Sequence, residues 1–242
     1  MSVIDFHAHV LPEIDDGSSS VEQSIIMLRE LHNQGVGCVV AAPHFYANHH
    51  TPERFLQKRR DAEQKLRTAI SSLSDLPKLC IGAEVHFFEG ISDCEFLRDM
   101  AIEGTDCVLV EMPMKQWSER NLQELMGIRQ KLKLTPIIAH VDRYISPFNS
   151  HGIPDQLATL PVYVQANANF FIKKTTRRYA LKLLSQDKIH LLGSDCHDTE
   201  GRAPNISGAV HVITRALGEK AVYRINALEH KLMACLSSDS IV

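Results

Sequence analysis

Short apolar runs alternate along the chain with longer stretches in which apolar positions recur every three or four residues. Seven of the short runs are typical of strands, at residues 3–10, 37–42, 78–85, 107–112, 136–140, 162–167 and 189–193. Their nearly continuous apolar character is expected of parallel strands that are covered on both faces. The spacing of apolar positions predicts helices over 18–34, 52–73, 92–103, 119–133 and 175–186, and two more after the last run.

Repeated strand–helix units favour a closed or nearly closed α/β barrel over an open sheet. The 242 residues contain no linker, internal repeat or low-complexity segment. We therefore predict a single domain over residues 1–242, built around seven parallel strands. Two predicted loops, 43–52 and 144–154, are long enough to cover a site at one end of such a barrel.

Composition and charge exclude several classes of protein. With 26 basic and 29 acidic residues the net charge is −3, which argues against nucleic acid as a partner because binding to phosphate backbones needs a basic face. No apolar run reaches the ~18 residues of a membrane span, and residues 1–9 lack the pattern of a signal peptide. Six cysteines without a CxxC pair predict reduced thiols. We expect a cytoplasmic protein without membrane insertion.

Residues of the kinds that bind metals stand at the ends of the predicted strands. His7 and His9 end the first run, and their i, i+2 spacing places both imidazoles on one face. The ends of later runs carry His44, Glu84, Glu111, His140, Asp195 and His197. Because the carboxyl ends of barrel strands meet at one rim, we expect these side chains to share one pocket. Imidazole and carboxylate ligands without thiolates indicate zinc, manganese or iron.

A lone histidine in an apolar run is usually a core residue, but eight metal-type side chains at strand ends are not expected by chance.

Three further residues near the predicted site are His86, Gln165 and Asn167. His86 follows Glu84 by two residues, so whether it reaches the same rim stays open. Gln165 and Asn167 end the sixth run, and we expect them to hydrogen-bond to ligands rather than to bind metal.

The segment DFHAHVLPEIDDG at residues 5–17 resembles the first motif of the polymerase-and-histidinol-phosphatase (PHP) superfamily. It is most similar to the branch of manganese-dependent bacterial tyrosine-protein phosphatases from capsule and exopolysaccharide loci. Further segments match in order: APH at 42–44, GAEV at 82–85, LVEM at 109–112, IAHVDRY at 138–144 and SDCHDTEGR at 194–202. The resemblance extends to about residue 236. It implies a distorted seven-stranded, TIM-like (β/α) barrel with three divalent metal ions at the carboxyl ends of its strands.

The resemblance also implies a role for each matched residue. One metal would be held by His7, His9, Glu84 and Asp195, a second by Glu84, Glu111 and His140, and a third by Asp16, His44 and His197. Manganese is the expected metal, with iron or zinc as alternatives. Arg143 and Arg202 would bind phosphate oxygens, and His44 is a candidate proton donor. Asp15, beside the ligand Asp16, is expected to cap the helix that begins near Ser18.

The reaction implied by the resemblance is hydrolysis of phosphotyrosine on a protein. Three divalent ions would outweigh the four ligand carboxylates, so the occupied pocket would attract a phosphate dianion. Metal coordination makes hydroxide available near neutral pH, and this metal-activated hydroxide would attack phosphorus in line. The implied substrate is the tyrosine-rich tail of a bacterial tyrosine kinase that controls capsule or exopolysaccharide synthesis.

Three other readings use the same residues. Cys196 and Arg202 satisfy the Cys-x5-Arg pattern of thiol-dependent phosphatases, but the intervening loop carries two acids, Asp198 and Glu200, which would repel phosphate. A small-molecule phosphomonoesterase, such as a histidinol phosphatase, would keep the metals and change the substrate. A non-catalytic, metal-loaded module that regulates a tyrosine kinase is a third reading. The chain retains every matched ligand and both arginines, which favours catalysis.

Overall fold

The computed structural model describes residues 2–114, 116–146 and 152–234. These residues form nine strands, arranged in one three-stranded sheet with the order β1-β2-β4 and one six-stranded sheet with the order β3-β5-β6-β7-β8-β9. Every pairing within the two sheets is parallel. The strands are β1 (Val3–Ala8), β2 (Val36–Ala41), β3 (His44–Phe45), β4 (Lys78–Ile81), β5 (Glu84–His86), β6 (Cys107–Glu111), β7 (Thr135–Ile138), β8 (Tyr163–Asn167) and β9 (Leu191–Gly193).

The two sheets meet where the chain bends between β2 and β3 and between β4 and β5. Pro43, which has no N–H to donate, separates β2 from β3, and Gly82 begins the bend after β4. Gly82 N donates to Ala41 O at 2.9 Å and Glu84 N donates to Pro43 O at 3.0 Å, so the two segments stay bonded through the bend. The prediction of an α/β fold with parallel strands is confirmed. The strand pairing, however, forms two sheets, the larger a half-barrel, rather than one ring of seven strands.

The first strand lies beside the last strand. Asp195 N donates to His7 O at 2.8 Å, and His9 N donates to Cys196 O at 2.9 Å. The buried carboxylate of Asp5 accepts hydrogen bonds from the backbone N, at 2.8 Å, and from the hydroxyl of Ser194. Burial raises the pKa of Asp5 to about 6, although the bonds from Ser194 oppose this shift. These contacts bring the two ends of the ligand-bearing sequence together.

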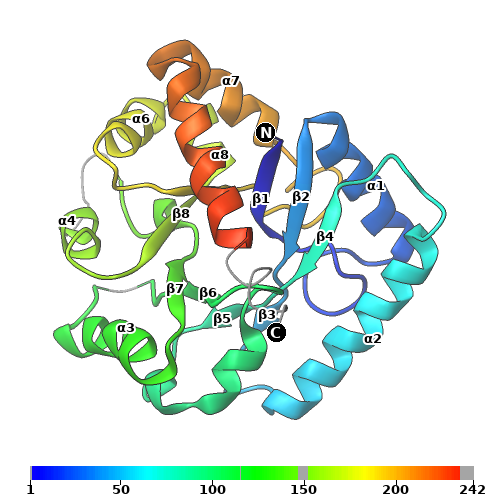
Figure 1. Ribbon diagram of the computed structural model, residues 1–242, viewed down its shortest axis with the longest axis horizontal. Coiled ribbons are helices and arrows are strands. Elements are labelled where there is room, and N and C mark those ends of the chain that lie inside the picture. Colours follow the sequence, from blue (N-terminus) through cyan, green and yellow to red (C-terminus); the bar gives the residue numbers. More distant parts are fainter. Residues whose placement is uncertain (1, 115, 147–151, 235–242) are drawn as a thin grey trace, which may run out of the picture.

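Helices surround the strands (Figure 1). They are α1 (Val21–Asn33), α2 (Pro52–Ile70), α3 (Glu119–Leu132), α4 (Ile153–Leu157), α5 (Ala168–Ile172), α6 (Arg177–Ser185), α7 (Ile206–Leu217) and α8 (Glu219–Ala234). Three 3-10 turns add η1 (Ile91–Asp93), η2 (Glu95–Met100) and η3 (Val141–Arg143). Across the described ranges, we find no helix with the length and apolar character needed to cross a membrane.

The largest differences from the predicted helix bounds lie in two segments. The first helix begins at Val21 rather than at residue 18, because the Ser20 side chain accepts the hydrogen bond from Gln23 N. The helix predicted over 92–103 is replaced by the two 3-10 turns η1 and η2. The predicted loop 144–154 lies partly outside the described residues.

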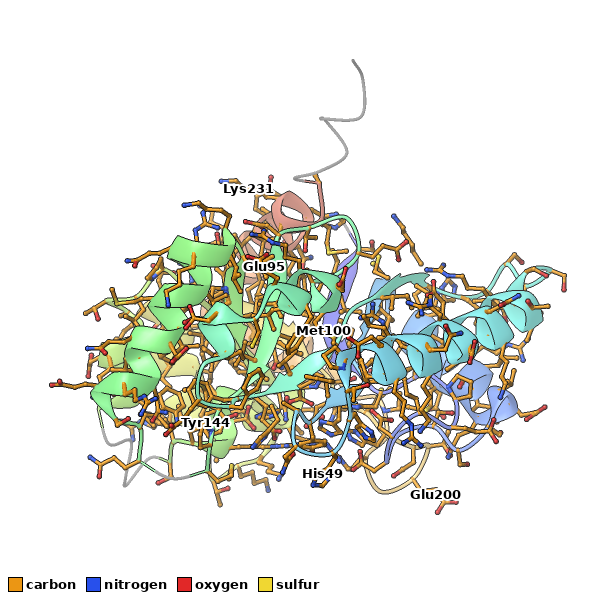
Figure 2. All side chains as sticks on the ribbon, turned by 90° about the horizontal axis from the view of Figure 1, so that it is seen from below. His49, Glu95, Met100, Tyr144, Glu200 and Lys231 are labelled. Carbon is orange, nitrogen blue, oxygen red and sulfur yellow. The ribbon has the colours of Figure 1, made fainter. Side chains whose placement is uncertain are left out.

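Helix α8 packs against β1 and β9, at the end of the strands that is opposite their carboxyl termini (Figure 2, where Lys231 marks α8). Its buried Glu229 accepts hydrogen bonds from Ile4 N and Leu192 N, each at 3.3 Å. Burial raises the pKa of Glu229 to about 8, and the nearby Asp5 adds to this shift. The glutamic acid is therefore neutral in the folded protein at pH 7.

A Glu229→Gln variant should lose less stability on going from pH 5 to pH 9 than the wild type. The folded wild type keeps a proton on Glu229 that the unfolded chain releases above its ordinary pKa near 4.5. This contribution is complete below the unfolded pKa and is lost as the pH rises through about 8. Free energies of unfolding in urea at the two pH values measure the difference, with Glu219→Gln, an exposed site on the same helix, as the control. Equal pH dependence in all three proteins would contradict the prediction.

Candidate metal centre

The carboxyl ends of the strands form one edge of the molecule, where the predicted ligands collect. In Figure 2, His49, Tyr144 and Glu200 lie along this edge, and Lys231 of α8 lies at the opposite one. Eight of the nine predicted ligands lie at the ends of strands or in the segment directly after a strand. This placement is expected, because the carboxyl ends of parallel strands that alternate with helices meet at one edge. The ninth, Asp16, comes from the loop between β1 and α1.

Glu84 lies at the middle of the centre. Its Oε2 lies 3.1 Å from His7 Nε2, 3.4 Å from His9 Nε2 and 2.9 Å from His44 Nδ1. Its Oε1 lies 2.6 Å from His140 Nε2. The Glu84 side chain is fully buried. Four imidazoles therefore surround one carboxylate at the first residue of β5.

The hydrogen bonding of this cluster is incomplete. His7 Nε2 and His9 Nε2 face each other at 3.1 Å, although a ring nitrogen pair can share only one proton. Glu84 Oε2, His44 Nδ1 and His197 Nε2 are buried and have no hydrogen-bond partner in acceptable geometry. Unpaired buried polar atoms are costly, typically ~1–3 kcal/mol each. Cations placed among these atoms would remove that cost, so the donor set fits a metal centre.

The side chains form three overlapping groups of candidate ligands, and within each group the ligand atoms all lie within 4.8 Å of one another. The groups are His9, Asp16, His44 and His197; His7, His9 and Asp195; and His44, Glu84 and Glu111. His140 joins the last group, with its Nε2 at 3.5 Å from Glu111 Oε1. All nine residues proposed from the sequence are thus brought together, but the groups differ from the predicted ones, because His9 also joins the group of Asp16 and His44 also joins the group of Glu84. The assignment of each residue to one ion stays a prediction.

Charge coupling within the cluster shifts several pKa values. Burial lowers the pKa of His140, but bonds to Glu111 and Glu84 outweigh it and raise the pKa to about 9. Burial raises the pKa of Glu111, but His140 and His86 lower it to about 2. Burial and the charge of His9 lower the pKa of His197 to about 4, so that its ring is neutral at pH 7. Metal ions bind deprotonated ligands, so loading this centre would release protons, and affinity would fall in acid.

Asp15 supports the ligands rather than capping a helix, which corrects the sequence prediction. Its Oδ2 accepts from His9 Nδ1 at 2.8 Å and from His44 N at 3.0 Å, and its Oδ1 accepts from Gly17 N at 3.0 Å. Helix α1 is capped by Ser20 instead. When one ring nitrogen of an imidazole binds a metal, a carboxylate that accepts a hydrogen bond from the other ring nitrogen fixes the tautomer and the orientation of the ring. Asp15 therefore directs His9 Nε2 toward the centre.

Gln165 and Asn167 bond to the ligands, as the sequence suggested. Gln165 Oε1 accepts from His140 N at 2.6 Å and lies 3.4 Å from His7 Nδ1. Asn167 Nδ2 donates to Asp195 Oδ2 at 3.0 Å. Both side chains come from β8 and are buried, so they help to position the predicted ligand of β1 and those that follow β7 and β9.

The two predicted phosphate-binding arginines lie beside the centre, where both contact Asp195. Arg143 donates through Nη2 to Asp195 Oδ2, and Arg202 donates through Nη2 to Asp195 Oδ1 at 2.9 Å. Their side chains are 31% and 39% exposed, so solvent reaches both guanidinium groups. One buried carboxylate thus positions two planar guanidinium groups, whose N–H donors match the geometry of phosphate oxygens.

Two rim residues were missed or left open by the sequence reasoning. His86 does reach the rim, where its Nδ1 lies 2.9 Å from Glu111 Oε2. The Tyr46 ring lies 5.3 Å from the rings of both His44 and His86. Both residues stand two positions after a predicted ligand, a spacing that favours the same face of an extended segment and that can be read from the sequence. Tyr46 was not predicted, because tyrosine is not among the residue types from which the metal site was inferred.

Cys196 is fully buried, on the side of its segment away from the ligands. Burial raises the pKa of its thiol well above the ordinary range. A protonated, inaccessible thiol cannot serve as a nucleophile. The Cys-x5-Arg match is therefore accidental, as predicted. Cys38, Cys80 and Cys94 form no disulfide bond, and Cys235 lies outside the described residues.

Together the fold and the site define a class, that of α/β proteins with a candidate polynuclear metal centre at the carboxyl ends of curled parallel strands. Residues 3–232 match the family described as capsular polysaccharide synthesis, CpsB/CapC, so the chain belongs to this family.

Named relatives match most of the chain. It is 26% identical over 228 residues to the tyrosine-protein phosphatase CpsB of Streptococcus pneumoniae, covering 90% of this chain and 92% of that protein. It is 24% identical over 229 residues to the tyrosine-protein phosphatase YwqE of Bacillus subtilis (strain 168), covering 92% and 88%. A crystal structure described with YwqE from Bacillus subtilis and CpsB from Streptococcus pneumoniae, unique metal-dependent tyrosine phosphatases, superposes with a TM-score of 0.82 at 22% identity, covering 96% and 94%. That structure shares the fold of this chain.

Proposed function

We propose that this chain is a metal-dependent protein-tyrosine phosphatase that hydrolyses the phosphomonoester of phosphotyrosine. The observation that carries the proposal is the convergence of four imidazoles on Glu84, below two arginines held by Asp195. Membership of the CpsB/CapC family and the tyrosine phosphatase relatives support it.

Three divalent ions, manganese foremost, would be held by the nine residues of the centre. When bound, the ions would supply positive charge for the phosphate and an activated water as nucleophile. The chain supplies the rest. Arg143 and Arg202 would orient and neutralise the phosphate oxygens, and Asp195 would keep both forks in place.

His44 fits metal binding better than proton donation. Its Nδ1 lies 2.9 Å from Glu84 Oε2 and its Nε2 lies 3.4 Å from Asp16 Oδ1, so both ring nitrogens face ligand carboxylates. A phenolate leaving group, with a pKa of ~10, needs little help from an acid. We therefore assign His44 to the metals and give the reaction no dedicated proton donor.

The wider setting is part of the proposal. We propose one domain, supported by the match over 3–232, and a distorted seven-stranded barrel in which β2 continues into β3, β4 continues into β5 and β1 lies beside β9. The proposed substrate is a phosphotyrosine protein, namely the tyrosine-rich tail of a bacterial kinase that controls capsule or exopolysaccharide synthesis. The expected cytoplasmic location stays a prediction.

Phosphate release from a phosphotyrosine peptide tests the proposed function. We expect release with added manganese, its loss after chelation, and unchanged rates in Cys196→Ser, because the buried thiol lies outside the chemistry. Activity that ignores the chelator and disappears with Cys196→Ser would contradict the metal mechanism. If the peptide is inert while histidinol phosphate is hydrolysed, the metal centre stands and the proposed substrate is wrong.

A further inference from the structure

The strands that carry the ligands also carry a second layer of side chains farther out. His44 and Tyr46 lie two residues apart at β3, and Glu84 and His86 lie two residues apart on β5, so each pair shares one face. In the parallel pairing His44 lies opposite Glu84, which puts Tyr46 and His86 in the next layer toward solvent. The inner layer holds metal-type ligands, and the outer layer holds aromatic rings.

These outer rings form a continuous surface, the aromatic wall, made of Tyr46, His49 and His86. The Tyr46 ring lies 5.3 Å from that of His86 and 5.8 Å from that of His49, at interplanar angles of 41° and 39°. Tyr46 and His86 are partly exposed and His49 is exposed, so the wall faces solvent at the edge labelled by His49 in Figure 2.

The aromatic wall is held firmly. The adjacent Phe45 is buried and packs edge-on against Phe55 at 5.1 Å and Phe96 at 5.7 Å. The turn after Tyr46 is closed by His49 N and His50 N, which both donate to Tyr46 O at 3.0 Å. A surface that is already ordered loses little conformational entropy when a ligand ring packs on it.

The position of the wall relative to the centre suggests its ligand. A phosphate bound among the ligands and the two arginines would point its ester oxygen out of the pocket. The group attached to that oxygen would then lie in the layer of Tyr46 and His86. Aromatic rings pack well at centroid distances of 4.5–7 Å, which an aryl group reaches and a short alkyl group does not.

We propose that the aromatic wall binds the phenyl ring of phosphotyrosine and selects aryl over alkyl phosphomonoesters, with Tyr46 as the main contact. This inference rests on the proposed function, because it places the substrate phosphate at the metal centre. Stacking on Tyr46 strengthens binding of the aryl group without changing the groups that hold the phosphate.

Binding of two phosphonates to the manganese-loaded protein tests the wall separately from turnover. Benzylphosphonate carries a ring, and methylphosphonate is the reference without one. In Tyr46→Ala we expect the ratio of benzylphosphonate to methylphosphonate affinity, measured by calorimetry, to fall about 10-fold, the size of one aromatic contact. Tyr46→Phe, which keeps the ring, should restore the ratio. In kinetics, Tyr46→Ala should raise KM for a phosphotyrosine peptide more than it lowers kcat.

The outcomes separate this inference from the proposed function. If Tyr46→Ala weakens both phosphonates equally, or leaves their ratio unchanged, the wall does not select aryl groups and the inference is overturned. Phosphate release by the wild type would still support the proposed function in that case. If the wild type binds benzylphosphonate more tightly in a Tyr46-dependent way but releases no phosphate from the peptide, the wall is supported and the proposed phosphatase activity fails.

Discussion

Glu84→Gln is expected to abolish phosphate release and to empty the metal centre. Glutamine keeps the size of the side chain but removes the charge that faces four imidazoles. We expect turnover to fall by well over ~100-fold, since losing even an indirect partner of a metal ligand typically costs 10–100-fold. Metal content by elemental analysis, measured beside phosphate release, checks both parts.

Glu95→Gln is the matched control for this substitution. Its side chain is 76% exposed on η2 and pairs only with Arg98 among the described contacts, so metal content and turnover should stay at wild-type values. Full metal content in Glu84→Gln would show that Glu84 is not a ligand. Full turnover with depleted metal would contradict the proposed chemistry as a whole.

Arg143→Lys and Arg202→Lys should each lower kcat/KM by ~100-fold or more while the metals are retained. Lysine keeps the positive charge but loses the planar fork that matches two phosphate oxygens. A guanidinium group stays protonated and offers no lone pair to a metal ion, so metal content should not change. Steady-state kinetics on a phosphotyrosine peptide, with metal analysis of the same samples, makes the measurement.

Arg120→Lys is the control for both variants, because Arg120 is a 66% exposed surface residue paired with Glu89. It should behave as wild type. Loss of metal from Arg202→Lys would mean that its contact with Asp195 holds the centre together, and our assignment of Arg202 to the substrate would then be wrong.

The sequence predicted the location of the site better than the details of the fold. Strand ends could be read from apolar runs, and parallel strands bring their carboxyl ends together, so His7 and His197 were expected to meet. The transfer of the chain from one sheet to the other at Pro43 and Gly82 was not predicted. The pattern of apolar positions indicates which residues are buried. Because residues before and after each bend are buried, this pattern does not reveal where one strand ends and the next begins.

Residues whose role depends on a tertiary partner were the hardest to assign. Asp15 could cap a helix or hold His9, and only the approach of His44 N and His9 Nδ1 to its carboxylate decides between the two. Likewise, the segment 92–103 has helical spacing but folds as 3-10 turns against α3. Tertiary packing overrides local preference in both cases.

The bond between Asp5 and Ser194 spans 189 residues of sequence. During synthesis on the ribosome the first strand with His7, followed by His9, emerges long before the segment that will lie beside it. The ligands from Asp195 and His197 arrive last, so a growing chain presents an incomplete centre for most of its elongation. Capture of metal at the proposed centre would therefore be deferred until nearly all of this sequence has been translated.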